Sequence, residues 1–392
     1  MKNIKDHVNL SGKIVLLRLD LNVPLNNNFI SDETRIDKIV PVINFLLKNK
    51  SKILILSHVG RPNGKQNNSL SLKPICLNLE KKINKKIKLI TTDLSGLTKD
   101  KLFSSKDEEV NFLENIRFYK EEETNDTKFA KQLASLGDLY VNDAFSCSHR
   151  RHASVSKITE FLPSYAGLQM QSEIDALKKI TSNVENPISC IIGGSKISTK
   201  LGLIKNLTIK VDNLFFVGGM ANNIINHKGF EIGRSLKEDN FKDIIYEIFN
   251  YAKTNSCKIF YPEDVIVGGK YDSFSEIKSL NEISNEDMIL DVGPKTIKNI
   301  SRIIETSKTV FWNGPAGYFE NESFANGSYQ IAKIIGSKTK QNSIYSVVGG
   351  GDTIAVINKV GNMDNFNFVS TAGGAFLEYL EGKELPGIKA LD

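Results

Sequence analysis

The chain of 392 residues has few cysteines and no long apolar run, and each absence excludes a class of protein. No stretch approaches the roughly 18 apolar residues of a membrane-spanning helix. The first residues contain no apolar signal region, so we expect no secretory export. The four cysteines (Cys76, Cys147, Cys190 and Cys257) are scattered without CxxC or zinc spacing. The sequence therefore predicts a cytoplasmic protein with reduced thiols that does not act at a membrane.

Several catalytic motifs are missing as well. The chain has no GxxxxGK[ST] loop, no GxGxxG dinucleotide fingerprint, and neither the HRD nor the DFG motif of protein kinases. His149 and His152 have no metal-ligand partners at a useful spacing, and no set of Ser, Cys and His suggests covalent catalysis. The sequence therefore gives no indication of covalent catalysis.

The composition indicates a globular protein of two domains. The length exceeds what one ordinary hydrophobic core supports, and the chain is 40% hydrophobic and 24% charged. A net charge of +6 without a long Lys/Arg block favours small anionic ligands and is weak evidence for nucleic acid. Only eight of the 51 cationic residues are arginines, and six of these fall in the first 151 residues. Arginine matches carboxylate and phosphate groups in a way that lysine does not, so this half is expected to bind an anion.

Apolar runs in the first half alternate with helical patterns. The expected strands are 14–19, 53–56, 87–90, 110–113 and 139–141, and the expected helices are 35–49, 71–82 and 127–136. This alternation predicts a parallel α/β sheet, in which ligands bind beyond the carboxyl ends of the strands. Polar clusters follow four of these runs at that point: residues 18–22, 57–61, 114–117, and 142–143 with 149–150. Any one arginine there could be a surface residue, but four clusters favour a site for a small anion.

The second half repeats the α/β pattern, but its strands end in glycine. A helical pattern at 169–184 separates the halves, and glycine-rich turns follow the strands at 193–194, 218–219, 314–317, 349–351 and 373–374. The run from Ser346 to Thr353 predicts a strand, a tight turn and a helix N-terminus, a common cradle for phosphate. Asp352 would share a Mg²⁺ with a bound nucleotide, or would simply be a helix N-cap. Lys196 and Lys200 are spaced to share one face of a helix that starts after Gly194.

Together these features suit phosphoryl transfer between two bound ligands, and the motifs resemble those of the phosphoglycerate kinase family over essentially the whole chain. In the first half the matching motifs are Arg18-x-Asp20-x-Asn22-Val23-Pro24, Ser57-His58-Val59-Gly60-Arg61-Pro62, Glu114-Asn115-Ile116-Arg117-Phe118, Asn142-Asp143-Ala144-Phe145 and His149-Arg150. In the second half they are Gly194-Ser195-Lys196, Trp312-Asn313-Gly314-Pro315, Gly349-Gly350-Gly351-Asp352-Thr353 and Leu385-Pro386-Gly387.

The resemblance implies a reaction and a set of site residues. It implies reversible in-line transfer of the acyl phosphate of 1,3-bisphosphoglycerate to Mg-ADP, giving ATP and 3-phosphoglycerate in glycolysis. The implied phosphoglycerate ligands are Asp20, Asn22, Arg35, His58, Arg61, Arg117 and Arg150. The implied nucleotide site is Gly194, Lys200, Asn313, Pro315, Gly317, Glu320, Gly349, Gly350, Gly351, Asp352 and Thr353, with Asp352 towards Mg²⁺. Arg35, Lys196 and Lys200 would stabilise the transferring group.

The expected fold is two doubly wound parallel-sheet domains, 1–168 and 185–373, joined by a connecting helix at 169–184. By the resemblance, an active-site cleft lies between the domains, residues 374–392 pack back on the first, and the chain is a monomer whose domains close about a hinge. Ala372 stands where the family commonly has glycine, so we expect a negative φ there. The alternatives are an NAD(P)-dependent dehydrogenase and a two-lobed anion-binding protein without catalysis.

Overall fold

The computed structural model describes residues 1–6, 9–26, 29–104, 109–269, 275–361 and 363–392. Its contacts divide the chain into two compact units, the first formed by Met1–Asp175 with Glu384–Asp392 and the second by Ala176–Lys383. Each unit contains its own six-stranded parallel sheet and its own hydrophobic core. The predicted α/β architecture with two parallel sheets is therefore confirmed.

The sheet of the first unit has the strand order β5-β6-β4-β1-β7-β8, and all its neighbours run parallel. Its strands are β1 (Ile14–Leu19), β4 (Lys52–Leu56), β5 (Lys88–Ile90), β6 (Val110–Leu113), β7 (Leu139–Asp143) and β8 (Ser164–Ala166). A short hairpin of β2 (Leu25–Asn26) and β3 (Phe29–Ile30) follows β1. Strand β1 lies between β4 and β7, so the chain builds the sheet outward from β1 in both directions, as in doubly wound folds.

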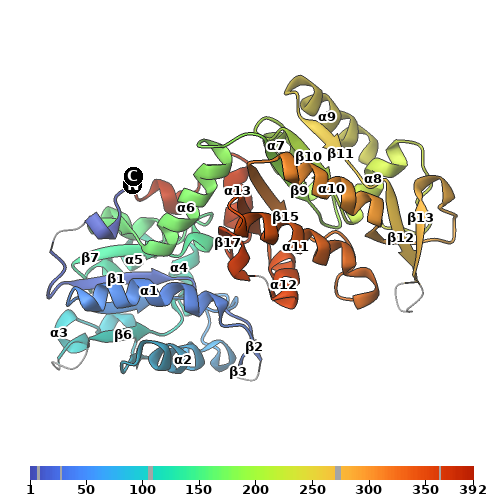
Figure 1. The fold of residues 1–392 in the computed structure, drawn as a ribbon. Coiled ribbons are helices and arrows are strands. Elements are labelled where there is room, and N and C mark those ends of the chain that lie inside the picture. Colours follow the sequence, from blue (N-terminus) through green and yellow to red (C-terminus); the bar gives the residue numbers. More distant parts are fainter. Residues whose placement is uncertain (7–8, 27–28, 105–108, 270–274, 362) are drawn as a thin grey trace. The chain divides into compact units, whose positions relative to one another are not determined.

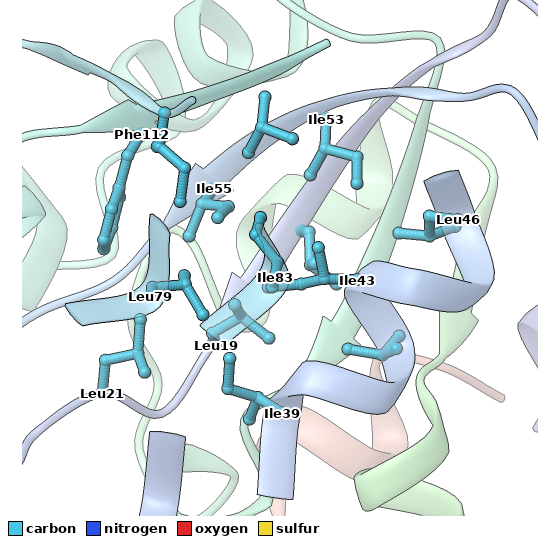
Figure 2. Close-up of a cluster of buried hydrophobic side chains, with 14 of the residues drawn as sticks. Leu19, Leu21, Ile39, Ile43, Leu46, Ile53, Ile55, Leu79, Ile83 and Phe112 are labelled. Atoms are coloured by element: carbon cyan, nitrogen blue, oxygen red, sulfur yellow. The ribbon is translucent and has the colours of Figure 1, made fainter. Parts of the chain in front are cut away.

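Helices α1 and α2 cover one face of this sheet. Figure 2 shows Ile39 and Ile43 of α1 in one cluster of buried side chains with Ile53 and Ile55 of β4 and Phe112 of β6. The apolar positions of α1 recur at helical spacing, so one stripe of the helix is buried against the sheet. The helices of this unit are α1 (Thr34–Lys48), α2 (Lys73–Ile83), α3 (Lys99–Leu102), α4 (Lys120–Glu123), α5 (Thr127–Ala134) and α14 (Pro386–Lys389); α6 (Leu168–Thr181) crosses the division (Figure 1).

The sheet of the second unit has the order β11-β10-β9-β15-β16-β17, again with parallel neighbours. Its strands are β9 (Ile188–Ile192), β10 (Asn213–Phe216), β11 (Lys258–Phe260), β15 (Thr309–Asn313), β16 (Tyr345–Gly349) and β17 (Phe368–Ser370). A separate antiparallel sheet consists of β12 (Asp264–Gly268), β13 (Ser275–Ser279) and β14 (Ile289–Val292). The parallel sheet changes winding direction between β9 and β15, and this is where such sheets bind ligands.

Helices pack on both faces of the second parallel sheet. On one face, Trp312 and Val310 of β15 share a core with α10, α11 and α12, and on the other face Phe311 contacts Phe376 of α13. The helices of this unit are α7 (Leu201–Thr208), α8 (Gly219–His227), α9 (Phe241–Thr254), α10 (Pro294–Thr306), α11 (Asn326–Lys340), α12 (Gly351–Val360) and α13 (Gly374–Leu380) (Figure 1). Among the described residues, no helix combines the length and apolarity needed to cross a membrane.

The unit division differs in detail from the domain limits read from the sequence. It falls between Asp175 and Ala176, inside α6, so that the first part of α6 belongs to one unit and the rest to the other. At the other end it falls between Lys383 and Glu384. Helix α13 stays with the second unit because it packs on α7, where Asn206 donates a hydrogen bond to the Leu380 carbonyl. The final segment belongs to the first unit, where the Gly387 N–H donates to the Ser148 carbonyl at 2.8 Å.

Candidate functional site

The four polar clusters of the first half follow β1, β4, β6 and β7, which are four adjacent strands of one parallel sheet. Parallel strands present their carboxyl ends at the same edge, so the loops that follow them meet there. This edge of the first unit carries the predicted phosphoglycerate ligands. We call it the cationic edge and define it by its predicted residues: Asp20, Asn22, Arg35, His58, Arg61, Arg117 and Arg150.

Hydrogen bonds link several residues of the cationic edge. Arg35, near the start of α1, forms an ion pair with Asp20 at 2.5 Å. Asn22 accepts a hydrogen bond from the Gly60 N–H at 2.9 Å, and Arg117 donates to the Gly60 carbonyl at 2.9 Å. The loops after β1, β4 and β6 are therefore fixed to one another through Gly60, which orients Asn22 and Arg117 together.

His58 and Arg150 extend the edge towards β7. His58 is only 3% exposed, and its Nδ1 lies 3.0 Å from an Nη of Arg18. Burial lowers the pKa of His58 well below its usual value, and the positive charges of Arg18, Arg117 and Arg150 lower it further. Arg150 donates from Nε to His149 at 3.2 Å, while Arg61 is exposed. The edge therefore has both buried, fixed cations and at least one exposed arginine.

The central group of the second unit is Lys200, in the loop between β9 and α7. Its ammonium donates to the Gly193 carbonyl and to Asn313 Oδ1, each at 2.7 Å. Gly193 follows β9 and Asn313 ends β15, so Lys200 lies at the point where the sheet changes winding direction. Burial lowers the pKa of Lys200 to about 8, although the negative charge of Asp352 opposes the shift. A cation held there suits an anionic ligand at the strand ends.

The glycine turns at this edge expose backbone where side chains would not fit. Gly350 has a φ of 101°, and a Cβ there would lie 2.8 Å from the side-chain nitrogen Nδ2 of Asn313. Asn313 donates in turn to the Gly349 carbonyl at 2.6 Å, and Thr353 Oγ1 accepts from the Gly314 N–H at 2.7 Å. The turns after β15 and β16 are thereby fixed to each other at the N-terminus of α12, whose first N–H groups can bind an anion.

Ala372 lies in the last of these turns. The positive φ there belongs to Gly373, at 56°, and Ala372 is absent from the described residues that have a positive φ. The expected negative φ of Ala372 is confirmed. The substitution is tolerated because the left-handed position falls on the next residue, which is a glycine.

A cavity of about 490 Å³ adjoins these turns within the second unit. Its polar rim includes Glu320 and Asp352, both exposed, and its walls include the apolar side chains of Leu236, Val265 and Met288. The predicted nucleotide residues Gly194, Pro315 and Gly317 also line it. An apolar pocket beside a phosphate cradle suits a flat base with an attached phosphate chain.

Lys196 does not lie on a helix with Lys200, so that prediction is wrong. A 3-10 turn begins only at Ser198 and α7 at Leu201, because the Glu238 carboxylate accepts the N–H groups of Ile197 (2.6 Å) and Ser198 (3.0 Å). Lys196 precedes this point and is exposed. The i, i+4 argument for two paired ammonium groups therefore fails, and only Lys200 is fixed at the strand ends.

The residues present fit a magnesium ion shared with a nucleotide. Asp352 lies in the first turn of α12, where its exposed carboxylate offers the hard oxygen ligand that Mg²⁺ prefers. In the described part of the chain no three His, Cys, Asp or Glu residues form a group that could hold a metal by themselves. Phosphate and water oxygens would therefore have to supply the remaining ligands, as is usual for Mg²⁺.

Comparison with known proteins agrees with this arrangement. A sequence model of the phosphoglycerate kinase family matches residues 4–383. The chain belongs to the phosphoglycerate kinase family. It is 46% identical over 389 residues to the phosphoglycerate kinase of Wolbachia pipientis wMel, covering 98% of this chain and 97% of that protein. It is 42% identical over 394 residues to that of Zymomonas mobilis, covering 100% and 99% of the two chains.

Solved structures of phosphoglycerate kinases also share the fold. The enzyme from Coxiella burnetii superimposes with a TM-score of 0.90 at 37% identity, covering 99% of this chain and 98% of the other. The enzyme from Pyrococcus horikoshii gives a TM-score of 0.84 at 28% identity, covering 100% and 98%. As a phosphoglycerate kinase family member, the chain is a phosphotransferase of glycolysis, and membership implies 3-phosphoglycerate and ADP or ATP as substrates. The comparisons do not support the dehydrogenase alternative.

The sequence reasoning missed the buried groups behind the cationic edge. Arg18 was noted only as part of a motif, yet it is fully buried and contacts His58. Glu122 and Ser154, which are linked to Arg18, were not considered. One signal was available in the sequence: Arg18 interrupts the apolar strand 14–19, and a charge at such a position must find a buried partner.

Proposed function

We propose that the chain reversibly transfers the acyl phosphate of 1,3-bisphosphoglycerate to ADP, giving ATP and 3-phosphoglycerate. Membership of the phosphoglycerate kinase family gives the reaction class, and the two strand edges supply suitable half-sites. The observation that carries the proposal is the contrast between these edges: guanidinium groups gather at one sheet, and glycine turns with a lysine gather at the other. Phosphoryl transfer requires two anionic ligands held in line and cations around the transferred group, without a nucleophilic side chain.

Phosphoglycerate is assigned to the cationic edge of the first unit. Arg117, fixed on Gly60, and the exposed Arg61 would bind its phosphate or carboxylate, since guanidinium groups match both anions. Asn22 and Asp20 would accept a hydrogen bond from its hydroxyl group or would orient Arg35. His58 and Arg150 complete the set from the β4 and β7 loops. These roles follow the family motif and are supported by the common location of the residues.

The nucleotide is assigned to the second unit. Its base would enter the apolar cavity, its ribose would reach the Glu320 carboxylate at the rim, and its phosphates would lie along Gly350–Thr353 and Lys200. Asn313 would hold the Lys200 ammonium in place, because Asn313 accepts its hydrogen bond. When bound between Asp352 and the phosphates, Mg²⁺ would neutralise charge that develops on the phosphate oxygens.

The transferred group would be stabilised by Lys200 and Arg35, with Lys196 as an exposed and more weakly supported contributor. Transfer requires the two ligands to meet in line, and water must be kept away from the acyl phosphate. We therefore propose that the units close about α6 before transfer. In small-angle scattering, adding both ligands should compact the molecule more than either ligand alone does.

A coupled assay tests the proposal directly. The protein with 3-phosphoglycerate and Mg-ATP should form 1,3-bisphosphoglycerate, detected by its reduction in the presence of the next enzyme and NADH. Omitting Mg²⁺ should abolish the signal, and nicotinamide cofactors alone should give no absorbance change. We expect a cytoplasmic monomer that needs neither nucleic acid nor membrane, which sedimentation and fractionation would check. Activity indistinguishable from the background without enzyme would refute the proposed reaction.

A further inference from the structure

Arg18 lies in the middle of the first unit's sheet, where charges are rarely found. Its side chain is 0% exposed, in strand β1 between β4 and β7. One Nη donates to the Leu19 carbonyl, and Nε donates to Ser154 Oγ at 3.0 Å. The other Nη lies 3.0 Å from His58 Nδ1 and 3.8 Å from Cys147 Sγ. A buried guanidinium with this many partners is held in one orientation.

A second layer of buried groups fixes Arg18 from behind. Ser154 donates from its hydroxyl to Glu122 at 2.7 Å, and its N–H donates to the other oxygen of Glu122 at 2.9 Å. Tyr140 donates to the Ser154 carbonyl at 2.6 Å, and Glu122 is itself fully buried. The Arg18 charge is thereby balanced through Ser154 by a carboxylate, so the cation is stable inside the sheet. This arrangement leaves one Nη directed at His58.

Contact with Arg18 decides the protonation of the His58 ring. Arginine can only donate, so His58 Nδ1 must accept and therefore carries no proton. A neutral ring then carries its proton on Nε2; among the described residues, the contact with Arg18 is the hydrogen bond that the structure gives this ring. The cations Arg18, Arg117 and Arg150 all oppose a positive charge on the ring. The balancing carboxylate, Glu122, bonds to Ser154 and not to His58.

We propose that Arg18 is a positioning residue that fixes His58 as the neutral tautomer protonated on Nε2, so that the ring donates one hydrogen bond to an oxygen of phosphoglycerate. The inference rests on the proposed role of His58 and adds that the ring acts as a dipolar donor, not as a further cation. Without Arg18, the proton could move to Nδ1, and the Nε2 lone pair would then face the anionic ligand. In this proposal the arginines supply the positive charge that attracts the ligand, while His58 supplies a hydrogen bond of fixed direction.

The wild-type protein can be tested without any substrate. The chain has five histidines, so selective ¹⁵N-histidine labelling gives few ring signals, and the His58→Gln variant identifies those of His58. We expect His58 to show a protonated Nε2 and a bare Nδ1, with no titration down to about pH 5, well below the usual histidine pKa of about 6.5. A ring protonated on Nδ1, or one that titrates near its usual pKa, would overturn the proposal.

A substitution tests the functional part. In Arg18→Met the His58 ring should populate both tautomers and take up a proton more readily, and the phosphoglycerate KM should rise on the order of 10-fold near neutral pH, about the effect of one hydrogen bond to a charged group. The ratio of the variant KM to the wild-type KM should fall as the pH is lowered, because a protonated ring donates from both nitrogens. This ratio cancels the titration of the substrate itself. A ratio that does not change with pH would mean that Arg18 is only structural.

Two further variants separate positioning from general loss of packing. Ser154→Ala removes the bond to Arg18 Nε but leaves the Nη contact with His58, so its KM ratio should not vary with pH even if the protein is less stable. In a His58→Gln background, Arg18→Met should no longer alter the pH dependence, because no ring remains to titrate. If the proposed substrate assignment is wrong, the His58 tautomer will be as expected, but neither Arg18→Met nor His58→Gln will change the phosphoglycerate KM.

Discussion

In both units the predicted ligand residues follow the carboxyl ends of parallel strands, but these residues differ in chemistry between the two units. In the first unit, the carboxyl ends of β1, β4, β6 and β7 carry the side chains that we propose bind an anion by charge, with Arg117 only 2% exposed. In the second unit, the ends of β9, β15 and β16 carry glycines, and the recognition surface is mainly backbone. A parallel sheet thus supplies the location, and the residues that follow each strand decide what is bound there.

This difference matches the chemistry of the two proposed ligands. A small acid with a phosphate offers little apolar surface, so it must be bound through ion pairs and hydrogen bonds. A nucleotide offers a flat base as well as phosphates, so it suits a cavity with apolar walls beside N–H groups. The side-chain edge should therefore be sensitive to truncation, and the backbone edge should be sensitive to an added Cβ.

Removing the cation assigned to the transferred group should have the largest effect at either edge. Lys200→Ala and Arg35→Ala are each expected to lower kcat by about 10³-fold or more, the scale reported for a cation that stabilises a phosphoryl transition state. Lys205→Ala and Arg234→Ala are matched controls, because each removes the same type of charge from a pair with a glutamate elsewhere in the second unit. Steady-state kinetics with both substrates at saturation measures the effect. A loss of less than about tenfold in both test variants would remove these residues from the catalytic role.

Adding a methyl group tests the backbone edge. Gly350→Ala should raise the nucleotide KM by roughly 10- to 100-fold, because strain of about 1–2 kcal/mol at a positive φ adds to a clash with Asn313. Gly361→Ala is a close control: it lies at the other end of α12, also has a positive φ, 68°, and has nothing within 4 Å of the added Cβ. It should lose similar stability in urea but keep its KM. Equal KM values in the two variants would show that Gly350 is needed only for folding.

Truncation of a guanidinium tests the side-chain edge. Arg61→Ala and Arg117→Ala should each raise the phosphoglycerate KM by about tenfold and leave the nucleotide KM unchanged, as expected for a lost charge-assisted hydrogen bond. Arg61 is exposed, so its variant carries little risk to the fold, whereas the Arg117 variant needs a parallel unfolding curve. An unchanged phosphoglycerate KM in both variants would mean that these arginines make only structural or surface contacts.

The strand ends could be predicted from the sequence because their signals are local. An apolar run followed by a polar or glycine cluster identifies where a strand stops, and β1 and β6 have the predicted bounds, Ile14–Leu19 and Val110–Leu113. Strand β13 gave no such signal, because its five residues, Ser275–Ser279, include a single apolar residue and lie largely exposed. It forms because its backbone pairs with β12, which the sequence pattern does not reveal.

Contacts between distant segments could not be predicted in the same way. Arg18 meets His58 because β1 and β4 are neighbours, and strand order cannot be read from periodicity. Lys196 was misplaced because Glu238, far along the chain, binds the N–H groups that begin the next helix. In both cases the residue types were informative, but their partners are set by topology.

The smallest expected effect is a pH dependence. It distinguishes the Lys200 ammonium, which can lose its proton, from the guanidinium groups of the other edge, which stay charged. Lys200 has a pKa lowered to about 8 by burial, so the free protein loses this charge as the pH rises through that value. The kcat/KM for nucleotide should therefore fall about threefold between roughly pH 7.5 and 8.5, since this parameter reports the free enzyme. Lys200→Arg should abolish the fall at whatever activity it retains, because arginine stays protonated. The phosphoglycerate KM should stay flat over the same range, because we assign the charges of its site to arginines. A parallel rise in this KM would mean that a titrating group also controls the side-chain edge.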